Sequence, residues 1–376
     1  MKSENRLIVA DSDHDANMLY AVGVFVPDPF IYLWTRGRAY IVMSDLEMDR
    51  ARRQAPQCRV LSLSRYLEQL RRGGLKSPGL AQVIPLLLSQ KGIRTVSVPY
   101  NFPAGLARDL ARARIQVKPK PGPFFPQREI KASSEVRKIS AALLMAEVGM
   151  AEAIQVLHAS KIGKDRRLIY RNVPLTSEKL RAVIDTAILQ ASGVANHTIV
   201  AGGKQGCDPH EIGFGPLRAH EPIILDIFPR SQKTGYFGDI TRTVVRGRAT
   251  EAVRRMYDTV LKGQSLAFRK MRPGVPTADV HRVVQEHFEG QGYKTTRRKG
   301  KMEGFFHGTG HGLGLEIHEP PRTAANSAGV LRPGHTVTVE PGLYYPEIGG
   351  VRLEDVALVT RNAPRNLTRF EKILEI

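Results

Sequence analysis

A segment dense in proline and glycine divides this chain into two parts with different hydrophobic patterns. Residues 118–126 read Lys-Pro-Lys-Pro-Gly-Pro-Phe-Phe-Pro. Proline fixes φ and lacks a backbone N–H, so such a segment continues neither a helix nor the interior of a sheet. The chain has 376 residues, and a single domain usually holds about 100–200. We therefore expect one domain over residues 1–126 and a second over residues 127–376.

Short apolar runs alternate with a helical pattern before this break. Ala39–Met43 and Thr95–Val98 have the composition of buried strands, and Leu80–Leu88 has the composition of an apolar helix. An alternation of strands and helices is typical of an α/β layer structure. The sequence therefore predicts a small α/β domain over residues 1–126.

After the break, apolar residues recur every three or four positions in four segments, which predicts four helices. The first carries a stripe from Ile139 to Leu157, and Ser133 or Ser134 can cap its start. The other three are expected to begin at Thr176, after Thr250 and at Thr277. Four further segments are rich in Val, Ile and Thr and are predicted strands: 222–228, 241–245, 336–339 and 351–360. The second domain is therefore expected to be α+β, with antiparallel strands covered by helices.

The chain is strongly basic, with 56 Lys and Arg against 36 Asp and Glu, a net charge of +20. Such a charge can mark a nucleic-acid surface. However, the excess is spread over both halves: residues 1–130 carry 20 basic and 11 acidic side chains, and residues 131–376 carry 36 and 25. The two densest clusters, residues 108–120 and 294–301, lack the interleaved aromatics on which bases stack. We therefore expect solvated surfaces and no nucleic-acid partner.

The cysteines and the hydropathy pattern indicate the compartment. Cys58 and Cys207 are too few for a disulfide framework. The first residues do not have the pattern of a signal peptide, and no uninterrupted apolar run approaches the roughly 20 residues that cross a bilayer. We expect a cytoplasmic protein without a membrane partner.

Acidic residues in apolar strands are the unusual feature of the second half. Asp226 lies within Ile-Ile-Leu-Asp-Ile-Phe, Asp239 precedes Ile-Thr, Glu340 follows Val-Thr-Val, and Glu354 lies within Val-Arg-Leu-Glu-Asp-Val. Taken singly, each could alternate outward to water. The same half contains a glycine-rich segment, residues 307–314, that reads His-Gly-Thr-Gly-His-Gly-Leu-Gly. Its four glycines argue against a helix, so this is not a helical zinc motif.

Four carboxylates that converged with one imidazole would repel one another strongly if they were buried without cations. Two divalent ions would neutralise them. A ligand set of several oxygens and one nitrogen suits Mn²⁺ or a similar borderline metal. The residues therefore point to a metal site with more than one ion.

At this point the chain resembles the pita-bread dinuclear metallopeptidase family, which includes methionine aminopeptidase, aminopeptidase P, prolidase and creatinase-like proteins. The resemblance covers residues 130–376, and the 13 residues between Glu340 and Glu354 match the family spacing. The segments that carry it are Asp226, Gly-Tyr-Phe-Gly-Asp-Ile-Thr-Arg-Thr at 235–243, Gly-His-Gly at 310–312, His-Glu at 318–319, Glu-Pro-Gly at 340–342 and Arg-Leu-Glu-Asp at 352–355. It implies a C-terminal pita-bread fold preceded by a smaller α/β creatinase-like domain.

The resemblance also implies roles for these residues. Asp226 would bind one metal ion, and Asp239 and Glu354 would bridge both. His311 and Glu340 would complete the ligands of the second ion. A hydroxide bridging the two ions would attack the peptide carbonyl, and Glu340 would carry its proton to the leaving nitrogen. The implied cofactors are two Mn²⁺ ions, with Co²⁺ or Zn²⁺ as alternatives.

Further residues would contact the substrate. His210 lies where the family has a substrate-binding histidine, and His318 matches a second one; both would donate hydrogen bonds to the substrate amide or its oxyanion. His307 matches an extra histidine of the aminopeptidase P and prolidase branch. For Arg352 two roles are open: it could pair with a ligand carboxylate or bind a substrate carboxylate.

One segment departs from the family pattern. Twelve residues separate Asp226 from Asp239, where about ten are usual, and Ile-Phe-Pro-Arg at 227–230 replaces a smaller residue and a glycine. The extra length most simply extends the hairpin between two strands and leaves both ligands in place. It would alter the wall of the substrate pocket.

The order of the domains indicates which branch of the family the chain resembles. Methionine aminopeptidases usually lack a large N-terminal α/β domain, whereas aminopeptidase P, prolidase and creatinase relatives have one. We therefore expect a dinuclear Xaa-Pro peptidase that acts on peptides with proline at the second position and forms a homodimer. It would either remove the N-terminal residue before proline, as aminopeptidase P does, or split Xaa-Pro dipeptides, as prolidase does. Two alternatives stay open: a hydrolase of a non-peptide C–N bond, and a non-catalytic binding protein that uses its basic surface.

Overall fold

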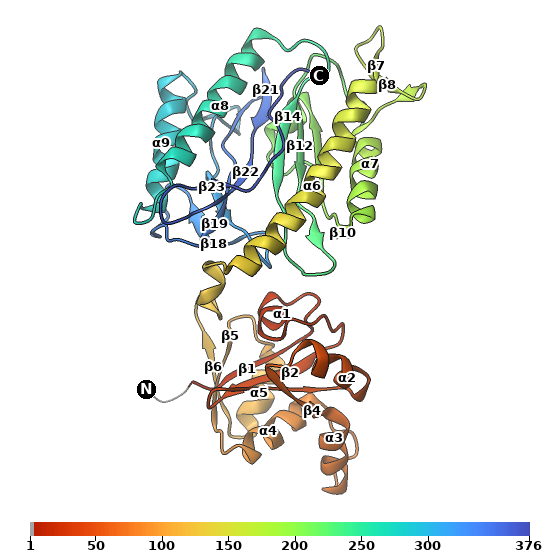
Figure 1. The fold of residues 1–376 in the computed structure, drawn as a ribbon, viewed down its shortest axis with the longest axis vertical. Helices are drawn as coiled ribbons and strands as arrows, with labels where there is room; N and C mark the ends of the chain where they lie inside the picture. Colours follow the sequence, from red (N-terminus) through yellow and green to blue (C-terminus); the bar gives the residue numbers. More distant parts are fainter. Residues whose placement is uncertain (1–3) are drawn as a thin grey trace. The chain divides into compact units, whose positions relative to one another are not determined.

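The computed structural model describes residues 4–376 (Figure 1), so the first three residues of the expected N-terminal domain lie outside the described residues. The chain forms two compact units, Met1–Arg128 and Glu129–Ile376. The boundary expected after Pro126 falls two residues before this division.

The N-terminal unit is a six-stranded sheet with helices on its faces (Figure 1). The strand order is β4-β3-β2-β1-β5-β6; β1, β2 and β3 are antiparallel, and β4, β5 and β6 each join a neighbour in parallel. Its strands are β1 (Arg6–Ala10), β2 (Phe30–Thr35), β3 (Arg38–Met43), β4 (Cys58–Ser62), β5 (Thr95–Pro99) and β6 (Gln116–Lys120). Its helices are α1 (Ala16–Val22), α2 (Asp45–Gln54), α3 (Leu63–Arg72), α4 (Leu80–Gln90) and α5 (Ala104–Arg112), and a short 3₁₀ turn spans Pro126–Glu129.

Two apolar layers explain the continuous apolar runs of this sheet. Leu7 and Val9 face one core cluster, and Ile8, between them, faces another. Strands that are buried on both faces need apolar residues at every position. The predicted strands at Ala39–Met43 and Thr95–Val98 and the predicted helix at Leu80–Leu88 are confirmed.

The C-terminal unit contains the four predicted helices: α6 (Ser133–Ala159), α7 (Ser177–Gln190), α8 (Glu251–Lys270) and α9 (Thr277–Gly290). Helices α7 and α8 begin where expected, after Thr176 and Thr250, and both threonines cap their helix with the side chain. The predicted cap of α6 is wrong. Its N-cap is Ala132, and Ser133 and Ser134 are the first helical residues. The Ala132 side chain cannot accept a hydrogen bond. A side chain within the helix contributes to the cap, because the carboxylate of Glu135 accepts a hydrogen bond from the Ala132 N–H at 2.8 Å.

The strands of this unit form two main antiparallel sheets and several short ones. The first main sheet has the order β11-β12-β14 and the second β18-β17-β19-β22-β23. Their strands are β11 (Ile199–Gly202), β12 (Ile223–Ile227), β14 (Ile240–Val244), β17 (Gly310–Gly312), β18 (Glu319–Thr323), β19 (Thr336–Val339), β22 (Asp355–Leu358) and β23 (Arg365–Asn366). The shorter pairings use β7 (Lys161–Ile162), β8 (Leu168–Tyr170), β9 (Val173–Pro174), β10 (Gly193–Val194), β13 (Arg230–Ser231), β15 (Thr296–Arg298), β16 (Lys301–Glu303), β20 (Gly342–Tyr345) and β21 (Gly349–Arg352), and a 3₁₀ turn spans Gly203–Cys207.

The segment 351–360, predicted as one strand, is two. Strand β21 ends at Arg352, and β22 begins at Asp355 in a different sheet. Between them the Glu354 N–H donates to the Thr241 carbonyl at 3.0 Å. The chain therefore changes sheets at Leu353 and Glu354, a step that composition does not reveal because no glycine or proline interrupts residues 351–360 at this point.

Helix α6 is the central helix of this unit. The part of its predicted stripe from Ala146 to Leu157 packs in the cluster that also contains residues of α7, β12 and β14, and Ile139 and Leu143 are buried as well. Within residues 4–376, it is also the one helix with the length and composition of a membrane span, although a core helix passes the same test. Glu147 and Glu152 interrupt its apolar run.

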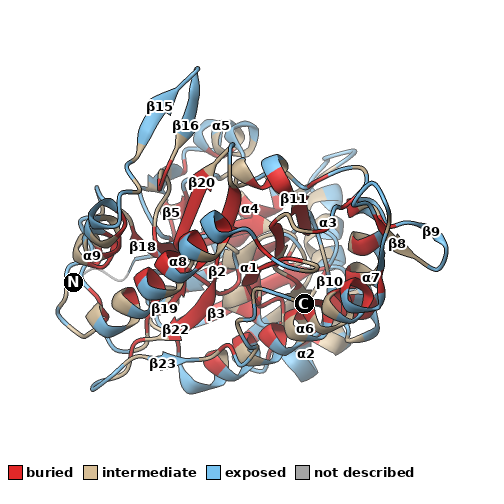
Figure 2. Ribbon diagram, turned by 90° about the horizontal axis from the view of Figure 1, so that it is seen from above, coloured by how far each residue is buried: buried red, intermediate tan, exposed pale blue. Residues whose placement is uncertain are grey.

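The second basic cluster lies on an exposed hairpin. Strands β15 and β16 are exposed to solvent over almost their whole length (Figure 2). They carry Arg297, Arg298 and Lys301, and Arg298 lies 3.5 Å from Glu347. These side chains are therefore solvated.

His335 gives a stability prediction. Its side chain is fully buried, its Nδ1 accepts a hydrogen bond from the Arg332 N–H at 3.1 Å, and Nε2 lies 3.6 Å from Glu129 Oε1. Burial, followed by the charges of Arg332 and Lys131, lowers the pKa of His335 to about 4. The unfolded chain therefore binds this proton first as the pH falls. We expect the free energy of unfolding to decrease between pH 6.5 and pH 4, by about 3 kcal/mol for this side chain.

The matched variant is His335→Asn, because an amide oxygen can accept the Arg332 N–H without titrating. Urea unfolding at pH 7, 6, 5 and 4 should give a shallower loss of stability for the variant than for the native chain. Parallel curves for the two proteins would refute the assignment.

Candidate metal centre

Strand pairing brings together acidic residues that are far apart in the sequence. Strands β12 and β14 are antiparallel, with Asp226 opposite Thr241, and Asp239 directly precedes β14. His311 lies on β17, Glu340 follows β19, and Glu354 precedes β22. Strands β17, β19 and β22 are neighbours in one sheet. All five predicted ligands therefore come from strands or strand ends.

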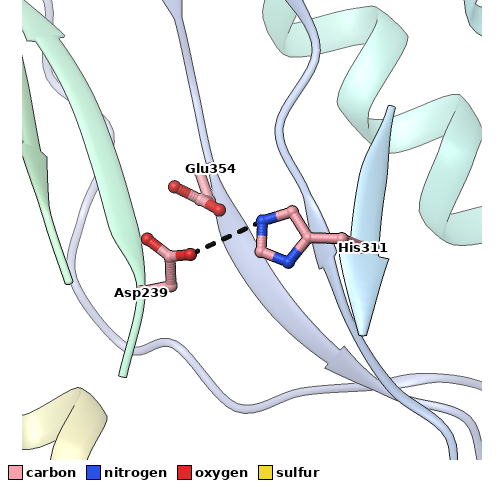
Figure 3. A group of neighbouring side chains, drawn as sticks. All are labelled: Asp239, His311 and Glu354. Atoms are coloured by element: carbon pink, nitrogen blue, oxygen red, sulfur yellow. Dashed lines mark ion pairs between the residues drawn. The ribbon is translucent and has the colours of Figure 1, made fainter. Parts of the chain in front are cut away.

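Three of them form a compact group (Figure 3). Asp239, His311 and Glu354 each offer a ligand atom, and these atoms lie within 4.8 Å of one another. His311 Nε2 is 3.7 Å from Asp239 Oδ2. The three residues are 4%, 8% and 2% exposed, respectively, so little of the group's own surface is exposed to solvent.

The other two predicted ligands border this group. Glu340 Oε1 lies 3.3 Å from His311 Nε2 and accepts a hydrogen bond from Thr338 Oγ1 at 3.2 Å. Asp226 Oδ2 accepts a hydrogen bond from Arg352 Nη2 at 2.7 Å. Among the described residues, the remaining oxygen of Asp226, Oδ1, is buried without a hydrogen-bond partner, and so is Glu354 Oε1.

The electrostatics of this group fit divalent cations. Burial, reinforced by the charges of Asp226 and Glu340, raises the pKa of Asp239 well above its ordinary value. Burial and the charge of Asp239 do the same for Glu354. Unpartnered buried carboxylate oxygens are costly, and hard oxygen ligands bind divalent ions. The residues therefore fit a cation site.

Burial has a second effect on two of the ligands. It lowers the pKa of His311 to about 4, which leaves the imidazole neutral at pH 7 and able to donate a lone pair to a metal. It raises the pKa of Glu340 to about 7. A carboxyl group with that pKa can both accept and release a proton near neutral pH.

Arg352 supports the ligand group through hydrogen bonds. Its side chain is buried and donates to Asp226 Oδ2, to Tyr344 Oη at 2.9 Å and to the Pro209 carbonyl at 3.4 Å. Of its two open roles, this position favours pairing with a ligand carboxylate. His307 joins the same chain of contacts: its Nε2 lies 2.8 Å from Tyr344 Oη and its Nδ1 2.8 Å from the Gly308 carbonyl. Both ring nitrogens of His307 therefore already have protein partners.

The two remaining histidines are exposed near the group. The ring of His318 lies 4.3 Å from that of His311, edge to face. Burial, followed by the charge of His311, lowers the pKa of His318 to about 4. His210 is exposed, and its charge contributes to the pKa values of Glu340 and His318. Both histidines are therefore close enough to the group to meet a bound molecule.

Sequence reasoning missed Tyr344 and Arg322. Tyr344 is buried and links His307 to Arg352; in the sequence it is one more aromatic residue of an apolar strand. Arg322 lies on β18 directly opposite His311 and is exposed. It contributes to the lowered pKa of both His311 and His318. The feature of the sequence that could have pointed to Arg322 is its position four residues after His318.

A buried ion pair fixes the loop that carries His318. Lys131 Nζ pairs with Glu319 Oε1, and the two side chains are 1% and 4% exposed. A Cβ on Gly314 would overlap the Glu319 carboxylate, so only glycine fits there. Glu319 therefore has a structural place here, next to His318.

Arg242 holds the backbone of the last ligand. It is fully buried and donates to the Glu354 carbonyl at 2.6 Å, to Asp355 Oδ1 at 2.9 Å and to the Phe370 carbonyl at 2.6 Å. Asp355 also pairs with Lys372. The two adjacent acids thus have opposite surroundings: Glu354 has an unpartnered oxygen, and Asp355 is fully paired.

Known proteins resemble this chain over much of its length. Residues 137–361 match the model of metallopeptidase family M24. An Xaa-Pro dipeptidase of Pyrococcus horikoshii is 30% identical over 287 residues, which cover 76% of this chain and 76% of the relative. An uncharacterized peptidase of Bacillus subtilis, YqhT, is 36% identical over 178 residues, 47% of this chain and 48% of the relative.

Solved structures confirm the expected fold. The prolidase from Pyrococcus furiosus has a TM-score of 0.79 at 23% identity and covers 98% of this chain and 97% of its own. The X-Pro aminopeptidase from Thermotoga maritima has a TM-score of 0.83 at 21% identity and covers 100% and 98%. Both similarities include the N-terminal unit, so the expected combination of an α/β domain and a pita-bread domain is correct.

The contrast between Glu354 and Asp355 gives a prediction. Glu354→Gln should lose most bound metal, because it removes a charged oxygen ligand, while the protein stays folded. Asp355→Asn should keep the metal but lose about 3 kcal/mol of stability, because it breaks a buried pair with Arg242. Metal analysis after dialysis against Mn²⁺ and urea unfolding measure the two effects. Equal metal content in native protein and Glu354→Gln would contradict the ligand assignment.

Proposed function

Because the chain belongs to metallopeptidase family M24, we propose that it is a dinuclear metallo-exopeptidase of the prolidase type, which splits Xaa-Pro dipeptides. The observation that carries this proposal is the buried group of Asp239, His311 and Glu354, with Glu340 and Asp226 at its border. An Xaa-Pro dipeptidase among its relatives supports the substrate class. The five ligands would hold two divalent ions, for which Mn²⁺ suits the donor set.

When bound, such ions lower the pKa of a coordinated water and polarise a carbonyl. Glu340 would accept the proton of the attacking water and deliver it to the leaving nitrogen. A carboxylate in contact with both the ions and the attacking water is placed for both transfers. The Thr338 hydroxyl, which donates to Glu340 Oε1, orients the carboxylate for this role.

The bond before proline explains the place of the histidines. Its nitrogen carries no hydrogen, so this amide has no hydrogen-bond donor. An enzyme can therefore hydrogen-bond to it only through the carbonyl oxygen, which accepts. His318 and His210 are exposed beside the ligands and would donate to this oxygen, most strongly when negative charge develops on it. Lys131 and Glu319 would keep His318 in position.

Arg322 supports a dipeptide over a longer substrate. A dipeptidase has to bind a free carboxylate beside the scissile bond, and a guanidinium suits that group. Arg352 is buried and committed to Asp226 and Tyr344. Arg322 is exposed and opposite His311, so we assign the substrate carboxylate to it.

A second candidate is aminopeptidase activity on longer peptides, which the fold shared with the X-Pro aminopeptidase favours. Hydrolysis of a non-peptide C–N bond and pure binding have no comparable support. Homodimer formation stays a prediction.

The test of the proposal is a cleavage assay on a peptide library, with Mn²⁺ and after chelation. Native protein should cleave Xaa-Pro dipeptides only with metal. Asp239→Ala should lower kcat/KM at least about 10³-fold, a loss of roughly 4 kcal/mol of transition-state stabilisation. Full activity in the variant, or no Xaa-Pro cleavage by the loaded native protein, would refute the proposal.

Arg322 provides a separate prediction. Arg322→Met should lower kcat/KM for Leu-Pro by about 10- to 100-fold, because a charge-assisted hydrogen bond is lost. The C-terminal amide of the same dipeptide should be cleaved equally by native protein and variant. Arg361→Met, at an exposed position, is the control. A similar loss with the amide, or a native preference for tripeptides, would instead favour the aminopeptidase.

A further inference from the structure

The hairpin between Asp226 and Asp239 continues in register beyond the two strands. Within β12 and β14, Ile227 is opposite Ile240. Further out, the Gly238 N–H donates to the Pro229 carbonyl at 3.0 Å, and Arg230 is bridged to Phe237. The expected extension of the hairpin is therefore present. It also fixes Phe228 directly opposite Asp239.

Alternation along the strand puts Phe228 on the face that carries the metal ligands. Side chains two residues apart share a face of a strand, so Phe228 lies on the face of Asp226. Burial has the same period: Leu225, Ile227 and Pro229 are buried, whereas Asp226 and Phe228 are half-buried. The half-buried row faces the ligand group, and the buried row faces the core.

Phe228 and Asp239 form a close pair. The Gly238 N–H donates to the Pro229 carbonyl, which makes these two residues a hydrogen-bonded position of the ladder. The next pair along, Phe228 and Asp239, is therefore a non-hydrogen-bonded pair. In such pairs the opposing side chains stand about 4.5–5.5 Å apart at Cβ. The side chain of Phe228 therefore leaves the backbone beside that of Asp239, a predicted metal ligand.

Two contacts hold this part of the hairpin in place. A Cβ on Gly238 would overlap the backbone of Ala142 on α6, so the hairpin lies directly against that helix. The Phe237 N–H donates to the Gly314 carbonyl at 2.9 Å, which joins the hairpin to the loop between His311 and His318. Phe237, on the same face as Phe228, therefore lies beside the loop that carries a predicted substrate-binding histidine.

We propose that Phe228 and Phe237 form an apolar wall next to the metal ligands that receives the side chain of the residue preceding proline. This inference rests on the proposed function and deepens it: the preferred substrates carry a large apolar residue at that position. An aromatic face buries apolar surface of such a side chain and offers no hydrogen bond to a polar one. Phe228 lies in the segment 227–230, which departs from the family pattern, so this departure would help to set the choice of substrate.

The test compares Leu-Pro and Phe-Pro with Gly-Pro and Ser-Pro. Phe228→Gly should lower kcat/KM for Leu-Pro and Phe-Pro about tenfold more than for Gly-Pro, mainly through KM. Phe228→Leu should restore most of the preference, and Phe237→Ala should show a smaller loss of the same kind. Metal content should equal that of native protein in all three variants.

Gln232→Ala, at the exposed tip of the same hairpin, is the control and should keep the native preference. Equal losses on all four dipeptides in Phe228→Gly would overturn the proposal, and so would an unchanged preference. Calorimetric binding of a Leu-Pro analogue with a reduced amide bond, compared with its Gly-Pro counterpart, gives the same comparison without turnover. A native protein that cleaves none of the dipeptides would refute the proposed function, while the binding comparison would still decide the role of Phe228.

Discussion

Mutual repulsion among buried carboxylates is the interaction on which the C-terminal unit depends. Asp239 and Glu354 have pKa values well above the ordinary range because each is buried beside other acids. A flexible chain would separate such groups. Here rigid strand pairings hold them together, and Arg352 is the one guanidinium known from the described residues to bond directly to a predicted ligand carboxylate. Apolar packing in two clusters around the strands stabilises the fold and so offsets the repulsion among the acids. Bound cations would reduce that repulsion.

Much of this unit could be predicted from the sequence, because hydrophobic period and capping act locally. The helices capped by Thr176 and Thr250 begin where predicted. The candidate ligands could be recognised because acids are rare in apolar strands, and the structure brings Asp239, His311 and Glu354 together. What local pattern could not supply are choices made by tertiary contacts.

Two structural features and the net charge show this limit. The change of sheet after Arg352 depends on a hydrogen bond to Thr241, more than one hundred residues away. The link from His307 through Tyr344 to Arg352 uses a tyrosine that is indistinguishable in sequence from a core residue. The net charge of +20 also misdirects, because it describes exposed surfaces such as the β15–β16 hairpin, whereas the candidate metal ligands are a few buried acids.

The contacts of Arg242 have a consequence for the order of folding. This one side chain joins the backbone of Glu354 to the carbonyls of Phe370 and Glu371. Thr368 adds a contact to the same region, because its Oγ1 accepts a hydrogen bond from the Val356 N–H at 2.9 Å. During synthesis, β12 and β14 leave the ribosome more than one hundred residues before these partners. The hairpin that carries Asp226 and Asp239 is therefore synthesised well before the segment that anchors the backbone beside Glu354. In the candidate metal centre, the backbone of Glu354 thus gains this support later in synthesis than the hairpin gains its strand pairing.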